Sequence, residues 1–107
     1  MIIVTTNDLP GYRIEEVFGE VTGLTVRARN IGTQFGAGLK SLVGGELKGL
    51  TKQLAQSREE ALQRLTETAE ARGANAVIAM RFDANEVSNG YQEIVAYGTA
   101  VRVTALG

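Results

Sequence analysis

The sequence predicts an α+β domain in which a small mixed sheet packs against one face of a long helix. β-Branched residues concentrate near both ends of the chain, and apolar residues recur at every third or fourth position in its middle. Pro, Gly and Asn separate these segments at the places where turns are needed. The expected order is β-β-α-α-β-β, with a short glycine-rich helix before the long one. The 107 residues suit a single domain, 1–107.

The first segments are expected to be two strands joined by a turn. Ile2 to Thr5 is a short β-branched run, and Pro10-Gly11 is typical of a type II turn, in which glycine supplies the positive φ. The chain from Tyr12 to Arg29 has the pattern of a long strand. Its alternation fails at Val17-Phe18, which predicts a β-bulge or burial on both faces there. Nearby Gly19 and Gly23 indicate a bend or a close approach by another element.

Six of the 13 glycines lie between residues 32 and 49, in a segment whose apolar residues have helical spacing. Each glycine inside a helix costs about 1 kcal/mol relative to alanine, against about 5–15 kcal/mol for a whole domain. Close backbone approach by another element or subunit would offset that cost. The small residues that we assign to close packing or assembly are Gly32, Gly36, Gly38, Ser41, Gly44, Gly45 and Gly49.

A second helix is expected from Glu46 to Arg72, after a break at Gly44-Gly45, with Gly73 as its C-cap. A capping box at Ser57 to Glu60 could begin a new helix. The apolar stripe keeps its phase across this point, so one continuous helix is expected. That stripe consists of Leu47, Leu50, Leu54, Ala61, Leu62, Leu65 and Ala69.

Two strands are expected after the helix, from Ala76 to Phe82 and from Glu93 to Val103. Asn89-Gly90 between them is a strong hairpin signal. In the last strand, alternate residues from Val95 to Val103 share one face. The strands on either side of the helices are expected to be parallel neighbours joined by a right-handed crossover.

The composition excludes several classes of function. A net charge of −1 argues against a dedicated nucleic-acid binder. Without cysteine or histidine the chain has neither thiolate chemistry nor the commonest general base. No apolar run reaches the roughly 20 residues that span a bilayer, and the N-terminus lacks the features of a secretory signal. A cytoplasmic protein without a cofactor is expected.

Arg27, Arg29 and Asn30 are the candidate ligand-binding residues. The two arginines share one face at a strand end, directly before the expected start of a helix. Helix N-termini attract anions, so these residues could hold a phosphate or carboxylate. The structural alternative is a solvated strand edge, or an ion pair with a glutamate of another subunit.

Arg58 lies within the apolar stripe of the long helix, where an unpaired charge is costly. One hypothesis pairs it with Glu16 or Glu20, which are expected on the strand face that carries Ile14 and Phe18. The other places its stem along the core with the guanidinium in water.

Neither a nucleotide site nor a metal site is assigned. The segment from Gly36 to Ser41 lacks the glycine that a P-loop requires before Lys-Ser. Two carboxylate pairs, Asp83 with Glu86 and Glu59 with Glu60, could bind a hard cation, but such pairs more often contact solvent. No nucleophile–base pair is visible, so no catalytic residue is assigned and the chain is expected not to be an enzyme.

Several blocks in this order and spacing resemble the YbjQ-like family. They extend over nearly the whole chain and are Pro10-Gly11-Tyr12, Val26 to Gly32, Gly36 to Leu39, Gly44 to Lys48, Ser57 to Leu62, Gly73 to Val77, Arg81 to Asp83 and Ala96 to Val101.

The resemblance implies a dodecin-like or YbjQ-like α+β subunit that assembles into a homopentameric ring. Members of this family often carry a heavy-metal-binding label. Heavy metals favour thiolate and imidazole ligands, which this chain lacks, so the label is not carried over to any residue.

These observations favour a non-enzymatic, ring-forming homo-oligomer with a structural role or with a small anionic ligand at its subunit junctions. The alternatives are a metal carrier that uses carboxylates and carbonyls, and a hydrolase or isomerase with carboxylate chemistry at an interface. No nucleic-acid partner and no membrane span are expected.

Overall fold

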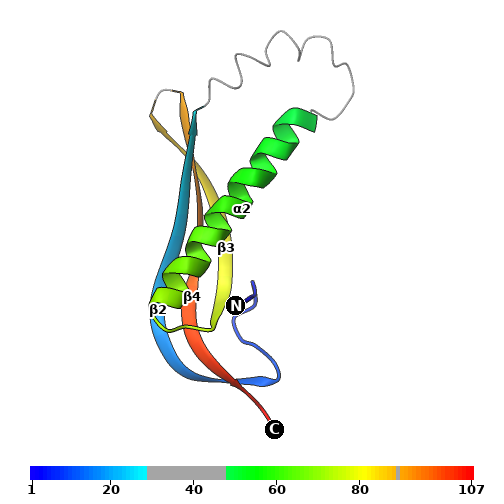
Figure 1. Cartoon of the computed structure of the whole chain (residues 1–107), viewed down its shortest axis with the longest axis vertical. Helices are drawn as coiled ribbons and strands as arrows, with labels where there is room; N and C mark the ends of the chain where they lie inside the picture. Colours follow the sequence, from blue (N-terminus) through cyan, green and yellow to red (C-terminus); the bar gives the residue numbers. More distant parts are fainter. Residues whose placement is uncertain (29–47, 89) are drawn as a thin grey trace.

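The computed structural model describes residues 1–28, 48–88 and 90–107, and it has one helix against one four-stranded sheet (Figure 1). The expected glycine-rich helix and its break at Gly44-Gly45 lie outside the described residues. The elements are β1 (Ile2–Ile3), β2 (Tyr12–Ala28), α2 (Lys48–Ala71), β3 (Ala76–Ser88) and β4 (Tyr91–Ala105). The predicted α+β class and mixed sheet are confirmed.

The strands lie in the order β1-β3-β4-β2. β4 is antiparallel to both of its neighbours, and β1 is parallel to β3. β2 and β3 therefore run in the same direction, but the prediction that they are neighbours is wrong. The hairpin after β3 folds β4 back beside it, and β4 takes the position next to β2.

The turn and the irregularities predicted in the first half of the chain are confirmed. Gly11 has a φ of +88°, and the Tyr12 N–H donates to the Leu9 carbonyl at 3.0 Å, as in a type II turn. The pairing of β2 with β4 shifts register between Ile14 and Glu16 and again between Val17 and Gly19. Gly19 supplies the positive φ of +100° at the second shift.

The helix α2 continues without a break through the segment from Ser57 to Glu60, as its unbroken stripe predicted. It ends at Ala71 and is capped by Gly73, whose φ is +88°. The Gly73 N–H donates to the Glu70 carbonyl and the Ala74 N–H donates to the Ala69 carbonyl, at 2.9 and 3.1 Å. This hydrogen-bond pair is the Schellman motif, so the predicted C-cap is confirmed.

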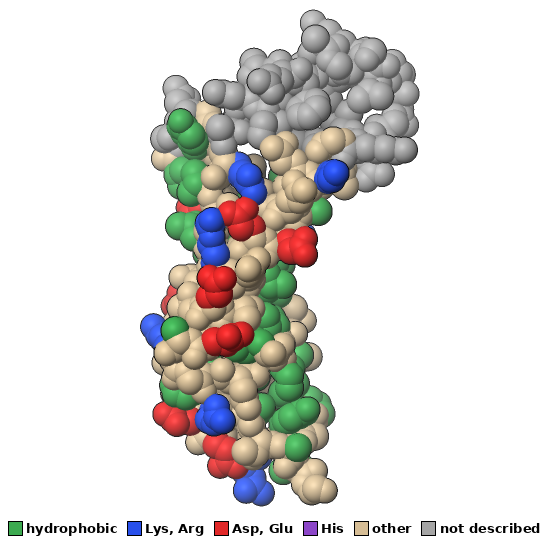
Figure 2. All heavy atoms as spheres, in the orientation of Figure 1, with side chains coloured by type: hydrophobic (Ala, Val, Ile, Leu, Met, Phe, Trp, Pro, Cys, Tyr) green, Lys and Arg blue, Asp and Glu red, His purple; other side chains and the backbone are tan. Residues whose placement is uncertain are grey.

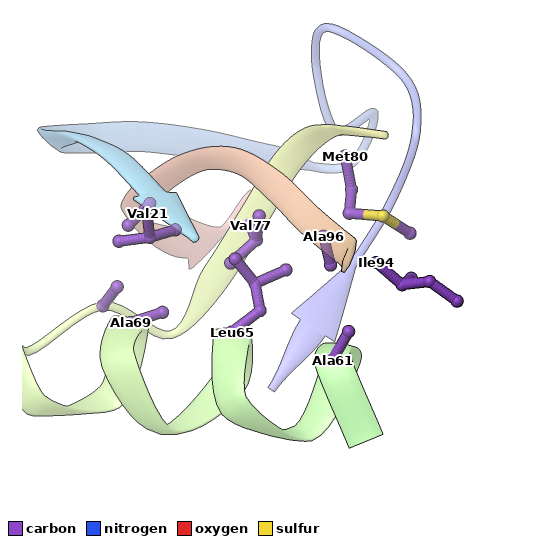
Figure 3. Packing of buried hydrophobic residues seen from close by; sticks show 10 residues of the cluster. Val21, Ala61, Leu65, Ala69, Val77, Met80, Ile94 and Ala96 are labelled. Atoms are coloured by element: carbon purple, nitrogen blue, oxygen red, sulfur yellow. The ribbon is translucent and has the colours of Figure 1, made fainter. Parts of the chain in front are cut away.

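The main core lies between α2 and the sheet. Figure 3 shows Ala61, Leu65 and Ala69 on the side of the helix that faces the strands, all fully buried. The stripe leaves this core toward the start of the helix, where Leu54 is 41% exposed. The strand residues opposite the helix are Val21, Val77, Met80, Ile94, Ala96 and Ala100.

A smaller core covers part of the opposite sheet face. It holds Ala76, Ile78, Val101 and Val103 under Ile2, Val4, Leu9 and Ile14. The N-terminal segment is held there because the Val4 N–H donates to the Val77 carbonyl and the Ala79 N–H donates to the Thr6 carbonyl. This segment covers only the part of the face near the start of β3. The rest of this face is not covered by the N-terminal segment.

The hairpin of β3 and β4 is longer than expected. β3 continues past Phe82 to Ser88, and β4 begins at Tyr91 rather than Glu93. The polar run after Phe82 has weak strand propensity. The backbone pairing with β4 extends it, because each added residue gains ladder hydrogen bonds.

Candidate functional site

Arg27 lies near the end of β2, where it forms an ion pair with α2. Its Nη2 is 2.5 Å from Glu60 Oε2, and Arg64 Nη2 is 2.6 Å from Glu60 Oε1. The Glu60 carboxylate thus forms ion pairs with two guanidinium groups. The three side chains are about one-third to one-half exposed. Arg27 Nε is buried without a hydrogen-bond partner among the described residues. Arg29 and Asn30 lie outside those residues.

The partner of Arg27 comes from the same chain, whereas the structural alternative had placed it in another subunit. The cluster of Arg27, Glu60 and Arg64 carries a net positive charge, since two cations share one anion. Arg64 also donates to the Leu24 carbonyl of β2 at 2.5 Å. The immediate effect of the cluster is to hold the end of β2 against α2. Acidic and basic side chains lie intermixed over the face seen in Figure 2.

Arg58 does not pair with Glu16 or Glu20, so that hypothesis is wrong. Its guanidinium carbon lies 5.3 Å from the centroid of the Phe82 ring, a cation–π geometry. The guanidinium is over β3, whereas both glutamates belong to β2, on the far side of β4. The Phe82 contact could not be foreseen because it depends on which strand lies under this part of the helix.

A groove opens between the first half of α2 and the ends of β3 and β4 that meet at their hairpin. Its volume is about 540 Å³. The lining residues are Thr51, Leu54, Ala55, Arg58, Phe82, Asp83, Ala84, Gln92 and Ile94. Sequence reasoning did not find this groove, because its walls come from segments far apart in the chain.

The sheet face opposite α2 is left open beyond the smaller core. The buried residues Val21 and Thr25 point to the helix side of β2, so Leu24 and Val26 point away from it. Leu24 pairs with Val95 and Val26 with Glu93, which places the odd-numbered residues of β4 on the same face. The apolar residues of this open sheet face are Leu24, Val26, Tyr91, Val95 and Tyr97; all but the half-buried Val95 are between 38% and 50% exposed. Thr22 and the half-buried Glu93 lie among them on the same face.

Comparisons with known proteins decide the family. A family model described as "Putative heavy-metal-binding" matches residues 1–104. The chain belongs to the YbjQ family. A UPF0145 protein from Acidothermus cellulolyticus is 63% identical over 99% of this chain and 98% of its own. A second UPF0145 protein, from Streptomyces coelicolor, is 63% identical over 96% of this chain and 97% of its own. A third, from Sulfurisphaera tokodaii, is 51% identical over 97% of this chain and 91% of its own.

The fold of this YbjQ protein is similar to a crystal structure of a DUF74 family protein of unknown function from Pediococcus pentosaceus. The TM-score is 0.56 with 22% identity, over 97% of this chain and 98% of the other. At this identity the likeness shows the fold alone. The names of these relatives state no catalytic activity.

The donor groups of this YbjQ chain do not fit a heavy-metal centre. It has no cysteine and no histidine, the side chains that soft and borderline metals prefer. Within residues 1–28, 48–88 and 90–107, no three metal-binding side chains gather. The Asp83 oxygens accept hydrogen bonds from the Ala84 N–H and the Asn85 amide, and Glu60 is held by two arginines.

In the same described ranges, no helix has both the length and the apolar character that crossing a bilayer requires.

Proposed function

We propose that this YbjQ protein is a non-enzymatic, cytoplasmic homo-oligomer, assembled as a ring, and that the open sheet face lies in its subunit contact. The open sheet face is the observation that carries the proposal. Four of its apolar side chains are more than one-third exposed on one face. Several exposed apolar side chains on one sheet face are typical of protein interfaces, and covering them with another copy would remove them from water.

The number of subunits comes from the family resemblance, which implies a pentamer. A closed ring also suits a small chain, because a domain of this size buries a modest core by itself. The role of such a ring is structural, or it is the binding of a small anion at subunit junctions near Arg27, Arg29 and Asn30. The positive charge left over in the cluster of Arg27, Glu60 and Arg64 supports an anion rather than a cation.

Native mass spectrometry of the protein from its own cells tests the assembly. The expected result is one dominant species of five subunits, together with any anion retained at the junctions. Light scattering at micromolar concentration provides a second measurement of size. A monomer in both measurements would overturn the proposal.

The competing function is a metal carrier, which the family description favours. Elemental analysis of protein purified without an affinity tag separates the two. We expect no stoichiometric transition metal, because thiolate and imidazole donors are missing. One metal ion per subunit would instead establish the carrier.

A further inference from the structure

We infer that the groove between α2 and the β3–β4 hairpin binds a small organic acid with an aromatic or branched apolar body. The site is separate from the open sheet face, and it adjoins the cluster of Arg27, Glu60 and Arg64, because its Gln92 pairs with Arg27 across the strands. Its volume of about 540 Å³ lies in the range of about 300–1,000 Å³ that is usual for small-molecule sites. Its chemistry is carried by side chains from three elements.

Most of the lining is apolar. Leu54 and Ala55 come from α2, Phe82 and Ala84 from β3, and Ile94 from β4. Leu54 is 41% exposed although it belongs to the apolar stripe of the helix, so the groove leaves an apolar wall in contact with water. An apolar body placed against this wall would remove that surface from water, at roughly 25 cal/mol for each Å² covered.

The polar part of the groove is dominated by one cation. Arg58 is exposed, and its guanidinium carbon lies 5.3 Å from the centroid of the Phe82 ring, without a carboxylate or carbonyl partner among the described residues. A guanidinium that keeps such an aromatic contact can still donate two N–H groups to one carboxylate. The half-buried amide of Gln92 lies in the same lining.

The side chain of Asp83, the acidic member of the lining, belongs to the opposite sheet face, because Asp83 pairs with Val95 and alternates with Phe82 and Ala84. Asp83 Oδ1 accepts from the Ala84 N–H at 3.0 Å, and Oδ2 lies 3.4 Å from the Asn85 Nδ2 donor. The charged group on the groove side is therefore the Arg58 guanidinium over the aromatic ring. This arrangement favours a carboxylate over an amine or a neutral ligand, because a ligand amine would meet the Arg58 charge.

The test compares acids with their uncharged amides of the same shape. The probes are phenylacetate, indole-3-acetate and 4-methylpentanoate, each beside its primary amide, titrated into the intact protein and followed by amide NMR shifts. At least one acid should bind with shifts confined to the groove residues, and about tenfold more tightly than its amide, since a hydrogen bond to a charged group contributes about 1.5–3 kcal/mol.

Two variants locate the effect. Arg58→Gln should abolish the preference for acid over amide, whereas Arg13→Gln, which removes an exposed arginine of β2, should leave it unchanged. Ala55→Phe should fill the groove and prevent binding, whereas Ala71→Phe on the same helix should not. The inference is overturned if the NMR shifts lie outside the groove or if none of the three acids binds. It is also overturned if acid and amide bind equally well, or if Arg58→Gln keeps the preference for the acid.

Discussion

At Gly23 the backbones of β2 and α2 approach each other closely. A Cβ atom built on Gly23 would overlap the backbone of the helix, at the carbonyl oxygen of Ala61 and the amide nitrogen of Leu65. The sequence indicated that this glycine marked a bend or a close approach, and the structure shows the second. The contact lets α2 lie directly on the strand, so that Ala61 and Leu65 reach the core on either side of Gly23.

Gly23→Ala should therefore be strongly destabilising. The methyl group meets backbone atoms rather than a flexible side chain, so the helix must move away and its core contacts loosen. We expect a loss of roughly 2–4 kcal/mol in the free energy of unfolding, in the range of other severe core substitutions. Urea unfolding followed by circular dichroism measures it.

Glu59→Ala is the control for that substitution, because Glu59 is exposed on α2 and lies outside both the core and the open sheet face. It should change stability by about 0.5 kcal/mol or less. Equal stabilities of the two variants would mean that the contact between Gly23 and the helix does not form in solution.

At the scale of elements, α2 both supplies the core and protects the edge of the sheet. Arg72 donates to the carbonyls of Phe18 and Glu20, at 3.3 and 3.1 Å, and Arg64 donates to that of Leu24. These carbonyls belong to β2, which is an edge strand of the sheet. Exposed strand edges invite pairing with other chains, and arginine side chains that occupy their acceptors oppose it. This arrangement supports assembly through the open sheet face rather than through the edge of β2.

The C-cap of α2 offers a prediction that belongs to the helix alone. Gly73 adopts a φ of +88°, which costs an L-residue roughly 1–2 kcal/mol. Gly73→Ala should lower the free energy of unfolding by about that amount, and Gly73→Asn should cost less, because asparagine tolerates this region better. Thermal and urea unfolding compare the three proteins. If the alanine variant is as stable as the native protein, residue 73 does not adopt the positive φ of this C-cap in solution.

In the whole molecule, the two faces of the sheet are covered to different extents. One face is packed by α2, and the other is covered by the N-terminal segment only around Ile78, Val101 and Val103. The remainder is the open sheet face. A face that is half core and half exposed apolar surface suits a subunit whose burial is completed by a neighbour.

A charge placed on the open sheet face should therefore reduce assembly. Leu24→Glu is expected to shift the protein toward smaller species by light scattering and analytical ultracentrifugation, because a buried carboxylate without a partner is costly. Gln56→Glu adds the same charge on exposed α2 and should leave the size unchanged. An unchanged size in Leu24→Glu would remove this face from the proposed interface.

Much of the element plan could be predicted from the sequence because its signals are local. The turn at Gly11, the bulge near Gly19 and the cap at Gly73 each rest on φ preferences that a few neighbouring residues express. The position of β4 between β2 and β3 could not be predicted, because local patterns do not rank alternative strand pairings. The Phe82 contact of Arg58 depends on that order and was missed with it. A glutamate partner for Arg27 was one of the alternatives, but Glu60 belongs to the same chain rather than to another subunit.

The sequence by itself determined the fold class, the order of the strands and the long helix among the described residues, the family and the absence of thiolate and imidazole chemistry. These follow from composition, periodicity and motif spacing, which are properties of the linear chain. The tertiary structure decided the strand order, the Arg58–Phe82 stack, the groove above it and the open sheet face. Each of these depends on side chains from distant segments meeting in space, and that meeting is decided by packing of the whole core rather than by any local preference.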